Sequence, residues 1–268
     1  CLEIIKLEKI LMEIIQSPQN KQVKEWKKLS SKKGRLNQKQ YILDGWHLVK
    51  EALQANESIQ RFLIVPDSRY VDEFNEFNVT KAEITYISPE VAHALSETPS
   101  PQGVFAIIMI DESKNVLPSD LTGAWLLLDS VQDPGNIGTM IRTADAAGFR
   151  GVVFGDGTGD LYQPKVVRSM QGSQFHLQLL QSDLITFIAE LKKKEIPTFG
   201  TELNNDAKSY DEIGKYSDFG LIMGNEGNGV QAKHLEMTKY NLYIPIIGQA
   251  ESLNVAVAAG ILMYTLKS

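Results

Sequence analysis

The sequence predicts a two-domain α/β protein whose second domain is a parallel sheet with helices on both faces. Short apolar strands alternate with helices in both halves of the 268-residue chain. A polar stretch at residues 111–120, which contains Pro118, reads as a linker between the halves. The length is sufficient for two ordinary domains with sizeable cores.

Residues 12–110 are predicted to form a small α/β domain, and residues 121–268 a second one. In the first, strands are expected at 41–43, 61–65, 83–87 and 102–109, and helices at 23–29, 44–53, 71–77 and 89–95. In the second, strands are expected at 124–128, 151–154, 176–180, 197–201, 219–223 and 241–244, and helices at 136–148, 166–171, 184–194 and 252–266.

The first candidate site lies where the strand at 124–128 passes into a helix. Asp133-Pro134-Gly135 predicts a sharp turn, Asn136 the N-cap of the helix, and Gly148 its end. Arg142 lies on the polar face of this helix, where a solvated charge is the simple interpretation. The apolar residues that mark its buried stripe are Ile137, Met140, Ile141 and Ala144.

Composition excludes several classes of protein. Cys1 is the only cysteine, which excludes disulfides within the chain and thiolate metal sites. The four histidines lie far apart in sequence, so no metal is expected. No apolar run is long enough to span a membrane, and the N-terminus lacks the pattern of a signal peptide. The expected location is a reducing cytoplasm.

The formal net charge is −6, which argues against a protein that coats nucleic acid. Residues 21–39, however, hold eight lysines or arginines against one acidic residue, Glu25. Such a segment is either a footprint for phosphate or a solvated basic helix. Before it, residues 1–11 precede Met12, which reads like a natural start, so we expect them not to belong to the fold. N-terminal sequencing of the native protein would test this.

Two glycine-rich stretches follow strands of the second half. Residues 155–159 superficially resemble a dinucleotide fingerprint, but their glycines do not open a helix directly, so at most they form a flexible active-site loop. Residues 224–230 place three glycines around one carboxylate, Glu226. Glycines let the backbone approach a ligand closely, although a tight surface turn with a solvated glutamate explains the same residues.

A third stretch covers residues 244–260. Ser252 is predicted to cap the final helix, which is apolar almost all round and therefore expected to be buried. Asn254, in the first turn of that helix, then needs a hydrogen-bond partner for its amide. Either a structural network of caps and amides or a ligand-binding loop would provide one.

Taken together, three motifs resemble those of the SpoU (TrmH-like) RNA ribose methyltransferases, in the family's order and spacing. They are Asn136-x-Gly138-x-x-x-Arg142-Thr143-Ala144, Gly224-Asn225-Glu226-Gly227-x-Gly229, and Ile244-Pro245 followed by Ser252-Leu253-Asn254-Val255. The resemblance covers about residues 120–268. More weakly, 44–51 and 101–104 resemble the ribosomal-protein-like RNA-binding domain that often precedes this catalytic domain.

The resemblance implies a deep trefoil knot, which connection rules alone would not suggest. It implies a homodimer and the cofactor S-adenosylmethionine, bound in the knot. The residues implied to contact the cofactor are Thr201, Glu202, Leu203, Gly224, Asn225, Gly229, Ile244 and Leu253.

The implied acceptor is a ribose 2′-hydroxyl, which distinguishes RNA from DNA. The family gives the key role to Arg142; since a guanidinium stays protonated, we expect it to clamp a phosphate and stabilise the developing alkoxide rather than act as a base. Asn136 would help to hold the loop, and Glu226 would orient Arg142 or accept a ribose hydroxyl. Ser252 and Asn254 would position the nucleotide.

Ribosomal RNA is a better candidate substrate than transfer RNA, because the two-domain layout resembles the ribosomal RNA branch of the family. Two alternatives stay open at this point. One is a knotted methyltransferase that acts on an RNA base, and the other a non-catalytic RNA-binding or ribosome assembly factor. The second would tolerate loss of Asn136, Arg142, Glu226 and Asn254, all of which are present.

Overall fold

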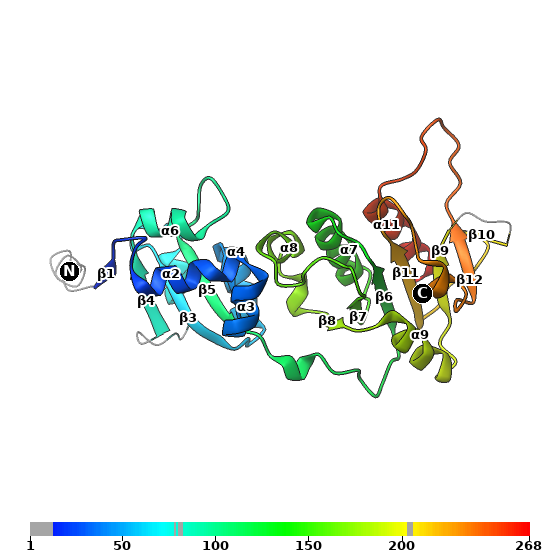
Figure 1. The fold of residues 1–268 in the computed structure, drawn as a ribbon, viewed down its shortest axis with the longest axis horizontal. Coiled ribbons are helices and arrows are strands. Elements are labelled where there is room, and N and C mark those ends of the chain that lie inside the picture. Colours follow the sequence, from blue (N-terminus) through cyan, green and yellow to red (C-terminus); the bar gives the residue numbers. More distant parts are fainter. Residues whose placement is uncertain (1–12, 78, 80–82, 203–205) are drawn as a thin grey trace. The chain divides into compact units, whose positions relative to one another are not determined.

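The computed structural model describes residues 13–77, 79, 83–202 and 206–268, so the prediction about residues 1–11 lies outside the described part. The chain divides into two compact units. Among the described residues, one comprises those up to Ile110 together with Tyr162–Pro164, and the other Asp111–Leu161 with Lys165–Ser268. Figure 1 shows the helices and strands of both units.

The first unit is built on a five-stranded mixed sheet of order β1-β4-β3-β5-β2, in which β5 runs antiparallel to both neighbours. Its strands are β1 (Ile14–Ile15), β2 (Gln40–Asp44), β3 (Ile59–Ile64), β4 (Ile84–Ile87) and β5 (Val104–Met109). Its helices are α2 (Lys21–Lys27), η1 (Lys28–Ser30), α3 (Lys32–Gln38), α4 (Trp46–Gln54), α5 (Val71–Asn75) and α6 (Pro89–Leu95).

The basic segment 21–39 forms two helices and a short 3-10 turn, where the sequence predicted one helix. Ser31 starts the second helix, because its hydroxyl accepts from the Gly34 N–H at 3.1 Å. The lysines of the segment are exposed, but Arg35 is buried and donates to the carbonyls of Leu29 and Ser30. Arg35 therefore belongs to the fold and not to a basic surface.

The second unit confirms the predicted parallel sheet, since all seven strands run parallel in the order β10-β12-β9-β11-β6-β7-β8. Its strands are β6 (Ala124–Asp129), β7 (Gly151–Phe154), β8 (Gln178–Gln181), β9 (Thr198–Thr201), β10 (Lys208–Ser209), β11 (Phe219–Gly224) and β12 (Tyr240–Tyr243). Its helices are η3 (Glu112–Lys114), α7 (Pro134–Ala146), α8 (Pro164–Met170), η4 (Ser173–Phe175), α9 (Leu184–Lys193), α10 (Ala232–Leu235) and α11 (Val255–Leu266).

Helices cover both faces of this sheet. Trp125 and Leu127 of β6 pack with Phe187 and Leu191 of α9 in one buried cluster. Because side chains alternate along a strand, Leu126 and Leu128 point to the opposite face. On that side α7 and α11 pack against one another, and Figure 1 shows α9 across the sheet from them. The neighbouring strands β6 and β11 are buried along their whole length, and β11 is the middle strand of the sheet.

The structure also bears on membrane and metal binding. Within the described ranges, no helix has both the length and the apolar character to cross a bilayer. The same residues contain no group of three or more histidine, cysteine, aspartate or glutamate side chains placed to hold a metal ion.

Candidate active site

The predicted N-cap of α7 is wrong by three residues. Asp133 is the cap, and its Oδ1 accepts from the Asn136 N–H at 2.7 Å, while Pro134 occupies the first helical turn. The Asn136 side chain is therefore not used to cap α7. It projects from the first turn of the helix and forms hydrogen bonds elsewhere.

The rest of the helix agrees with the predicted pattern. The stripe Ile137, Met140, Ile141 and Ala144 is fully buried. Gly148 has φ +69°, the left-handed conformation expected after a helix end. Arg142 is exposed, and within the described chain its guanidinium has no hydrogen-bond or ion-pair partner. It is free to take a ligand from solvent.

The glycine-rich stretch after β11 folds back on itself. Asn225 and Gly229 exchange backbone hydrogen bonds of 3.0 and 2.9 Å. A Cβ at Gly224 would lie 2.1 Å from the Gly229 carbonyl carbon, and Gly229 has φ +68°. These two glycines are needed for the turn itself, which places Glu226 at its tip.

Glu226 faces the start of α7 and not Arg142, so one of the two roles predicted for it is wrong. Its carboxylate accepts from Asn136 Nδ2 at 3.1 Å and from the backbone N–H groups of Gln132 and Asp133 at 3.3 and 3.1 Å. Partial burial raises the pKa of Glu226, but these hydrogen bonds outweigh burial and leave the pKa below its ordinary value. The group is an anion at neutral pH.

Asn254, and not Ser252, caps α11. Its Oδ1 accepts from the N–H groups of Ala256 and Val257 at 2.9 and 3.3 Å. Its Nδ2 donates to Asn136 Oδ1 at 2.9 Å, which supplies the partner that the sequence required. Asn254 is exposed rather than buried. The final helix is likewise not covered all round, because Val257 and Tyr264 are 53% and 59% exposed.

Glu226, Asn136 and Asn254 thus form one chain of hydrogen bonds, which we call the amide relay. Its members come from three stretches that lie 90 and 118 residues apart in sequence. All three lie near the carboxyl ends of strands, the edge at which parallel α/β sheets bind ligands. The relay therefore marks a candidate active site.

A cavity of about 560 Å³ lies beside the relay, since Ser252 and Leu253, the two residues before Asn254, are part of its wall. Of the residues predicted to bind a cofactor, Thr201, Glu202, Ile244 and Leu253 line it. Gly224, Asn225 and Gly229 are not among the lining residues, and Leu203 lies outside the described chain. Ser252, which was predicted to position the nucleotide, also lines the cavity. The lining residues for which the sequence predicted no role in the site are Leu242, Tyr243, Pro245, Ile246, Glu251, Ala258 and Leu262.

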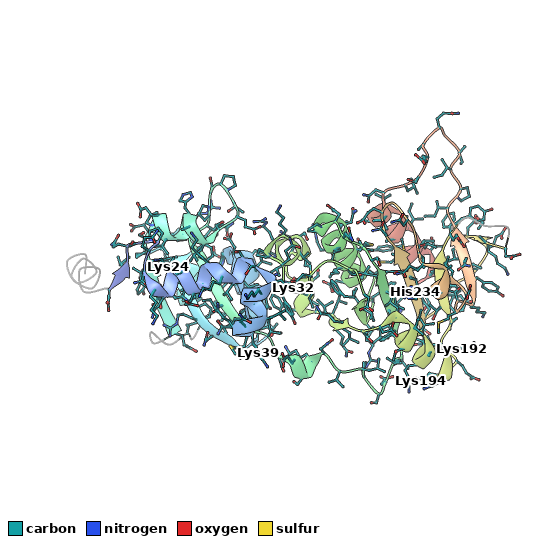
Figure 2. The ribbon with its side chains drawn as sticks, viewed as in Figure 1. Lys24, Lys32, Lys39, Lys192, Lys194 and His234 are labelled. Carbon is teal, nitrogen blue, oxygen red and sulfur yellow. The ribbon has the colours of Figure 1, made fainter. Side chains whose placement is uncertain are left out.

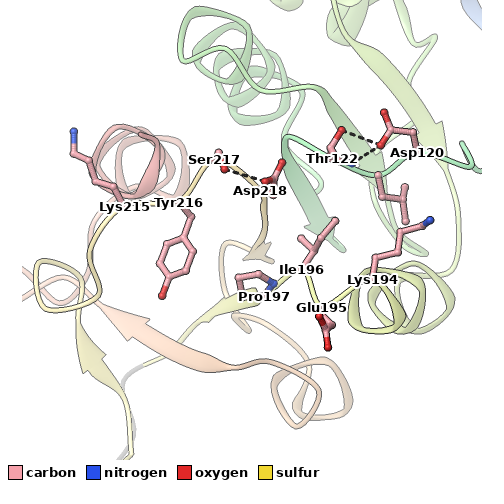
Figure 3. A pocket seen from close by; sticks show the side chains of 11 residues that line it. Asp120, Thr122, Lys194, Glu195, Ile196, Pro197, Lys215, Tyr216, Ser217 and Asp218 are labelled. Carbon is pink, nitrogen blue, oxygen red and sulfur yellow. Dashed lines mark hydrogen bonds between the residues drawn. The ribbon is translucent and has the colours of Figure 1, made fainter.

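A second cavity, of about 700 Å³, opens at the opposite edge of the sheet, where β6, β9 and β11 begin. Two of its three acidic side chains are bonded within the wall: Asp120 accepts from Thr122, and Asp218 from Ser217 (Figure 3). Backbone and side-chain hydrogen bonds from Thr122 and Arg150 lower the pKa of Asp120 to about 2. None of the three motifs lines this cavity, so it is not the candidate site.

The loop at residues 155–159 is anchored to the segment that joins β6 to α7. Thr158 Oγ1 donates to the Leu128 carbonyl at 2.8 Å, and the Gly159 N–H to the Val131 carbonyl at 2.8 Å. The next helix, α8, begins only at Pro164. The glycines therefore do not open a helix, and the geometry of a dinucleotide-binding turn is absent from this loop.

Both units of the chain match known protein families. Residues 123–264 match the SpoU rRNA Methylase family, and residues 20–106 match the MRM3-like substrate binding domain. The chain is 44% identical over 256 residues to the 23S rRNA (guanosine(2553)-2′-O)-methyltransferase RlmP of Bacillus subtilis, covering 96% of this chain and 100% of the relative. It is 29% identical to a putative TrmH family tRNA/rRNA methyltransferase of Staphylococcus saprophyticus, over 83% and 93% of the two chains.

Solved structures agree with these matches. An AdoMet-bound rRNA methyltransferase from Sinorhizobium meliloti superimposes with a TM-score of 0.83 at 28% identity, over 95% of this chain and 97% of that one. An RNA 2′-O ribose methyltransferase superimposes with a TM-score of 0.81 at 28% identity, over 94% and 97%.

Close packing of α8 on α7 generates a stability prediction. A Cβ at Gly138 would lie 2.0 Å from Ser169 Oγ and 2.5 Å from the Ser169 carbonyl carbon, whereas at Gly260 of α11 the nearest atom is 3.7 Å away. We expect Gly138→Ala to lower the free energy of unfolding by about 1–3 kcal/mol through overpacking. Gly260→Ala should raise it by up to about 1 kcal/mol, the usual gain in a helix.

Both variants can be compared by thermal unfolding followed by circular dichroism. A Gly138→Ala protein that melts at or above the wild-type temperature would show that α8 does not pack on α7 in this way.

Proposed function

This chain belongs to the SpoU rRNA methylase family, and we propose that it methylates the ribose 2′-hydroxyl of a guanosine in 23S ribosomal RNA with S-adenosylmethionine as donor. The observation that carries the proposal is the amide relay beside the 560 Å³ cavity. The relay joins the three family motifs at one edge of the sheet. Identity of 44% along the whole of the Bacillus subtilis relative supports the same RNA as substrate. The site of action would then be the cytoplasm.

The cavity suits S-adenosylmethionine. Its volume lies within the range of about 300–1,000 Å³ that is usual for small-molecule sites. Leu242, Ile244 and Leu253 provide apolar walls for an adenine ring, while Glu202 and Glu251 provide carboxylates for a ligand with a sulfonium and an ammonium group. When bound, the cofactor supplies a methyl group on a positively charged sulfur.

Arg142 is the residue that meets the RNA in this proposal. Its exposed, unpaired guanidinium offers a planar fork of donors that matches a phosphate. A guanidinium stays protonated, so it holds the neighbouring phosphate and stabilises negative charge on the 2′-oxygen instead of accepting a proton.

The relay holds the loops around this point. Ionised Glu226 fixes Asn136 and the N–H groups of residues 132 and 133, and Asn136 in turn fixes Asn254 at the start of α11. Ser252 lies in the cavity wall two residues before Asn254, which supports a contact with the cofactor or the nucleotide. In this role Glu226 is a positioning residue and not the partner of Arg142.

Replacing Arg142 should separate chemistry from cofactor binding. Arg142→Ala is expected to lower kcat by about 10²–10³-fold, the usual cost of removing one donor to a developing oxyanion. The affinity for S-adenosylmethionine, measured by calorimetry, should stay unchanged because Arg142 does not line the cavity. The assay is transfer of labelled methyl to unmodified 23S RNA, followed by nucleoside analysis for 2′-O-methylguanosine.

Each outcome of this assay is informative. Label on a base would place the enzyme with the knotted base methyltransferases, and absence of both label and cofactor binding would favour an RNA-binding factor without activity. Near-normal turnover of Arg142→Lys would exclude a planar, bidentate role.

A homodimer is the proposed assembly. Val257 and Tyr264 lie seven residues apart on one face of α11 and are more than half exposed, while the opposite face packs on α7. An apolar helix face of this kind is typical of a protein–protein interface. A second copy that covers it would lie beside the start of α11 and could complete the site.

Sedimentation analysis tests the dimer. Val257→Glu with Tyr264→Glu should yield a folded monomer with lowered methyl transfer, because two charges would be buried without partners. Ile185→Glu on α9, where the isoleucine is 39% exposed, serves as the control and should stay dimeric. A double variant that remains dimeric would place the interface elsewhere.

The first unit is proposed to bind the RNA. Lysines on α2 and α3 are exposed, and Figure 2 labels Lys24 on α2, Lys32 at the start of α3 and Lys39 directly after α3. Lys28 is held by Glu25 at 2.7 Å, so we assign the phosphate contacts of these helices to Lys24 and Lys32. The match of residues 20–106 to a substrate binding domain supports this role.

Salt dependence measures these phosphate contacts. For Lys24→Glu with Lys32→Glu, the slope of log affinity against log salt should become shallower by about 1.4–1.8, since each lost contact contributes about 0.7–0.9. Lys192→Glu with Lys194→Glu makes the same charge change in the second unit and should leave the slope near the wild-type value (Figure 2). Equal slopes for both double variants would rule out a specific role for the first unit.

A trefoil knot is also proposed. The connection between β9 and β11 pairs with β12 at Lys208–Ser209 and with the end of α11 at Tyr216, whose N–H donates to the Leu266 carbonyl at 2.7 Å. The connection thus contacts both β12, at the start of the last part of the chain, and the end of α11. A loop would make both contacts if the chain from β12 to α11 passed through it. Such threading would place the cavity inside the knot.

A further inference from the structure

Asp129 is a buried carboxylate that the proposed mechanism does not use. It is the last residue of β6, and it is 1% exposed. Its Oδ2 accepts from the Gln231 N–H at 2.7 Å and from His234 Nδ1 at 2.8 Å, and its Oδ1 accepts from Gln231 Nε2. Apart from Ser130 Oγ, which donates to Oδ1 at 3.3 Å, the side-chain and backbone donors to this carboxylate come from a single short segment that follows the glycine-rich turn.

This contact is chemically well defined. Burial raises the pKa of Asp129, but the hydrogen bonds from Gln231 and His234 outweigh it and leave the pKa below its ordinary value. The carboxylate is therefore ionised, so His234 must donate through its Nδ1 hydrogen. His234 is itself buried in α10, so the contact is shielded from water.

The contact of Asp129 with Gln231 and His234 joins the two loops that carry the amide relay. Asp129 directly precedes residues 130–133, two of whose N–H groups hold Glu226. Gln231 and His234 directly follow the turn that carries Glu226 at its tip. A second bond, from Asn225 Nδ2 to the Ser130 carbonyl at 2.9 Å, joins the same two segments. Asp129 and His234 therefore tie together the bases of the two loops whose tips meet in the amide relay.

We propose that Asp129 and His234 are positioning residues, which fix the glycine-rich turn so that Glu226 holds Asn136 in the geometry required for methyl transfer. This inference rests on the proposed function for its effect on rate, but not for its effect on the turn. Neither residue lines the 560 Å³ cavity, and neither does the turn at residues 225–230. Loss of the contact should thus lower kcat and leave the affinity for the cofactor nearly unchanged.

Substitutions at His234 can remove the donor or keep it. The Nδ2 of an asparagine lies at the same branch position as the Nδ1 of a histidine, so His234→Asn keeps a donor toward Asp129. His234→Leu fills a similar volume but removes the donor and leaves the buried carboxylate with one partner fewer. Leu235→Ala, in the same helix and also buried, lowers stability without touching Asp129 and controls for a general loss of stability.

The experiment compares these variants with the full-length wild type in three measurements: hydrogen exchange of the amides at residues 225–231, calorimetric affinity for S-adenosylmethionine, and methyl-transfer kinetics on unmodified 23S RNA. For His234→Leu we expect faster exchange in the turn and a kcat lower by about 10–100-fold, with cofactor affinity within about threefold. His234→Asn should recover most of both losses, and Leu235→Ala should show neither.

The proposal fails if His234→Leu folds with wild-type exchange and kcat, or if Leu235→Ala loses as much kcat at the same melting temperature. It also fails if cofactor affinity falls in parallel with kcat. If the wild type itself transfers no methyl group, the proposed function fails, while the exchange data still decide whether Asp129 and His234 fix the turn.

Discussion

The site depends on the two hydrogen bonds of the Asn136 side-chain amide, one through Nδ2 and one through Oδ1. These two atoms cannot exchange places. Asn254 Oδ1 is occupied by two N–H groups of α11, so only its Nδ2 can face Asn136. Asn136 must then present Oδ1 to Asn254 and Nδ2 to Glu226. Glu226 can only accept, and its lowered pKa keeps it ionised. The direction of the whole relay is thus determined by the cap of one helix.

The parallel sheet makes this meeting possible. Strands β6 and β11 are neighbours in register, with Gly224 opposite Asp129, so the loops that leave them start side by side. One loop leads into α7 and the other carries Glu226. The start of α11 reaches the same place because α11 packs on α7. Strand pairing and helix packing therefore bring residues that are far apart in sequence together, and no feature of the sequence around each residue is needed to specify the contact.

Local patterns predicted the parallel sheet, the buried stripe of α7 and the motif residues, but not how the polar side chains are used. Asp133 and Asn136 can each cap α7, as Ser252 and Asn254 can each cap α11, and sequence alone does not choose between them. The choice is made by tertiary partners: Asn136 is taken by Glu226 and Asn254, which leaves Asp133 for the helix. Leu242 and Tyr243 were missed for a similar reason, since their place in the cavity follows from β12 lying beside β9.

The groups proposed to bind RNA and the groups proposed to act in methyl transfer lie in different units of the chain. The chain has a net charge of −6, so we expect RNA binding to rely on a local concentration of lysine. That concentration lies on α2 and α3 of the first unit, whereas the second unit contributes an unpaired arginine and a cavity. Only an RNA that contacts both the lysines of the first unit and the site of the second gains binding energy from both, so RNA bound in other positions is disfavoured.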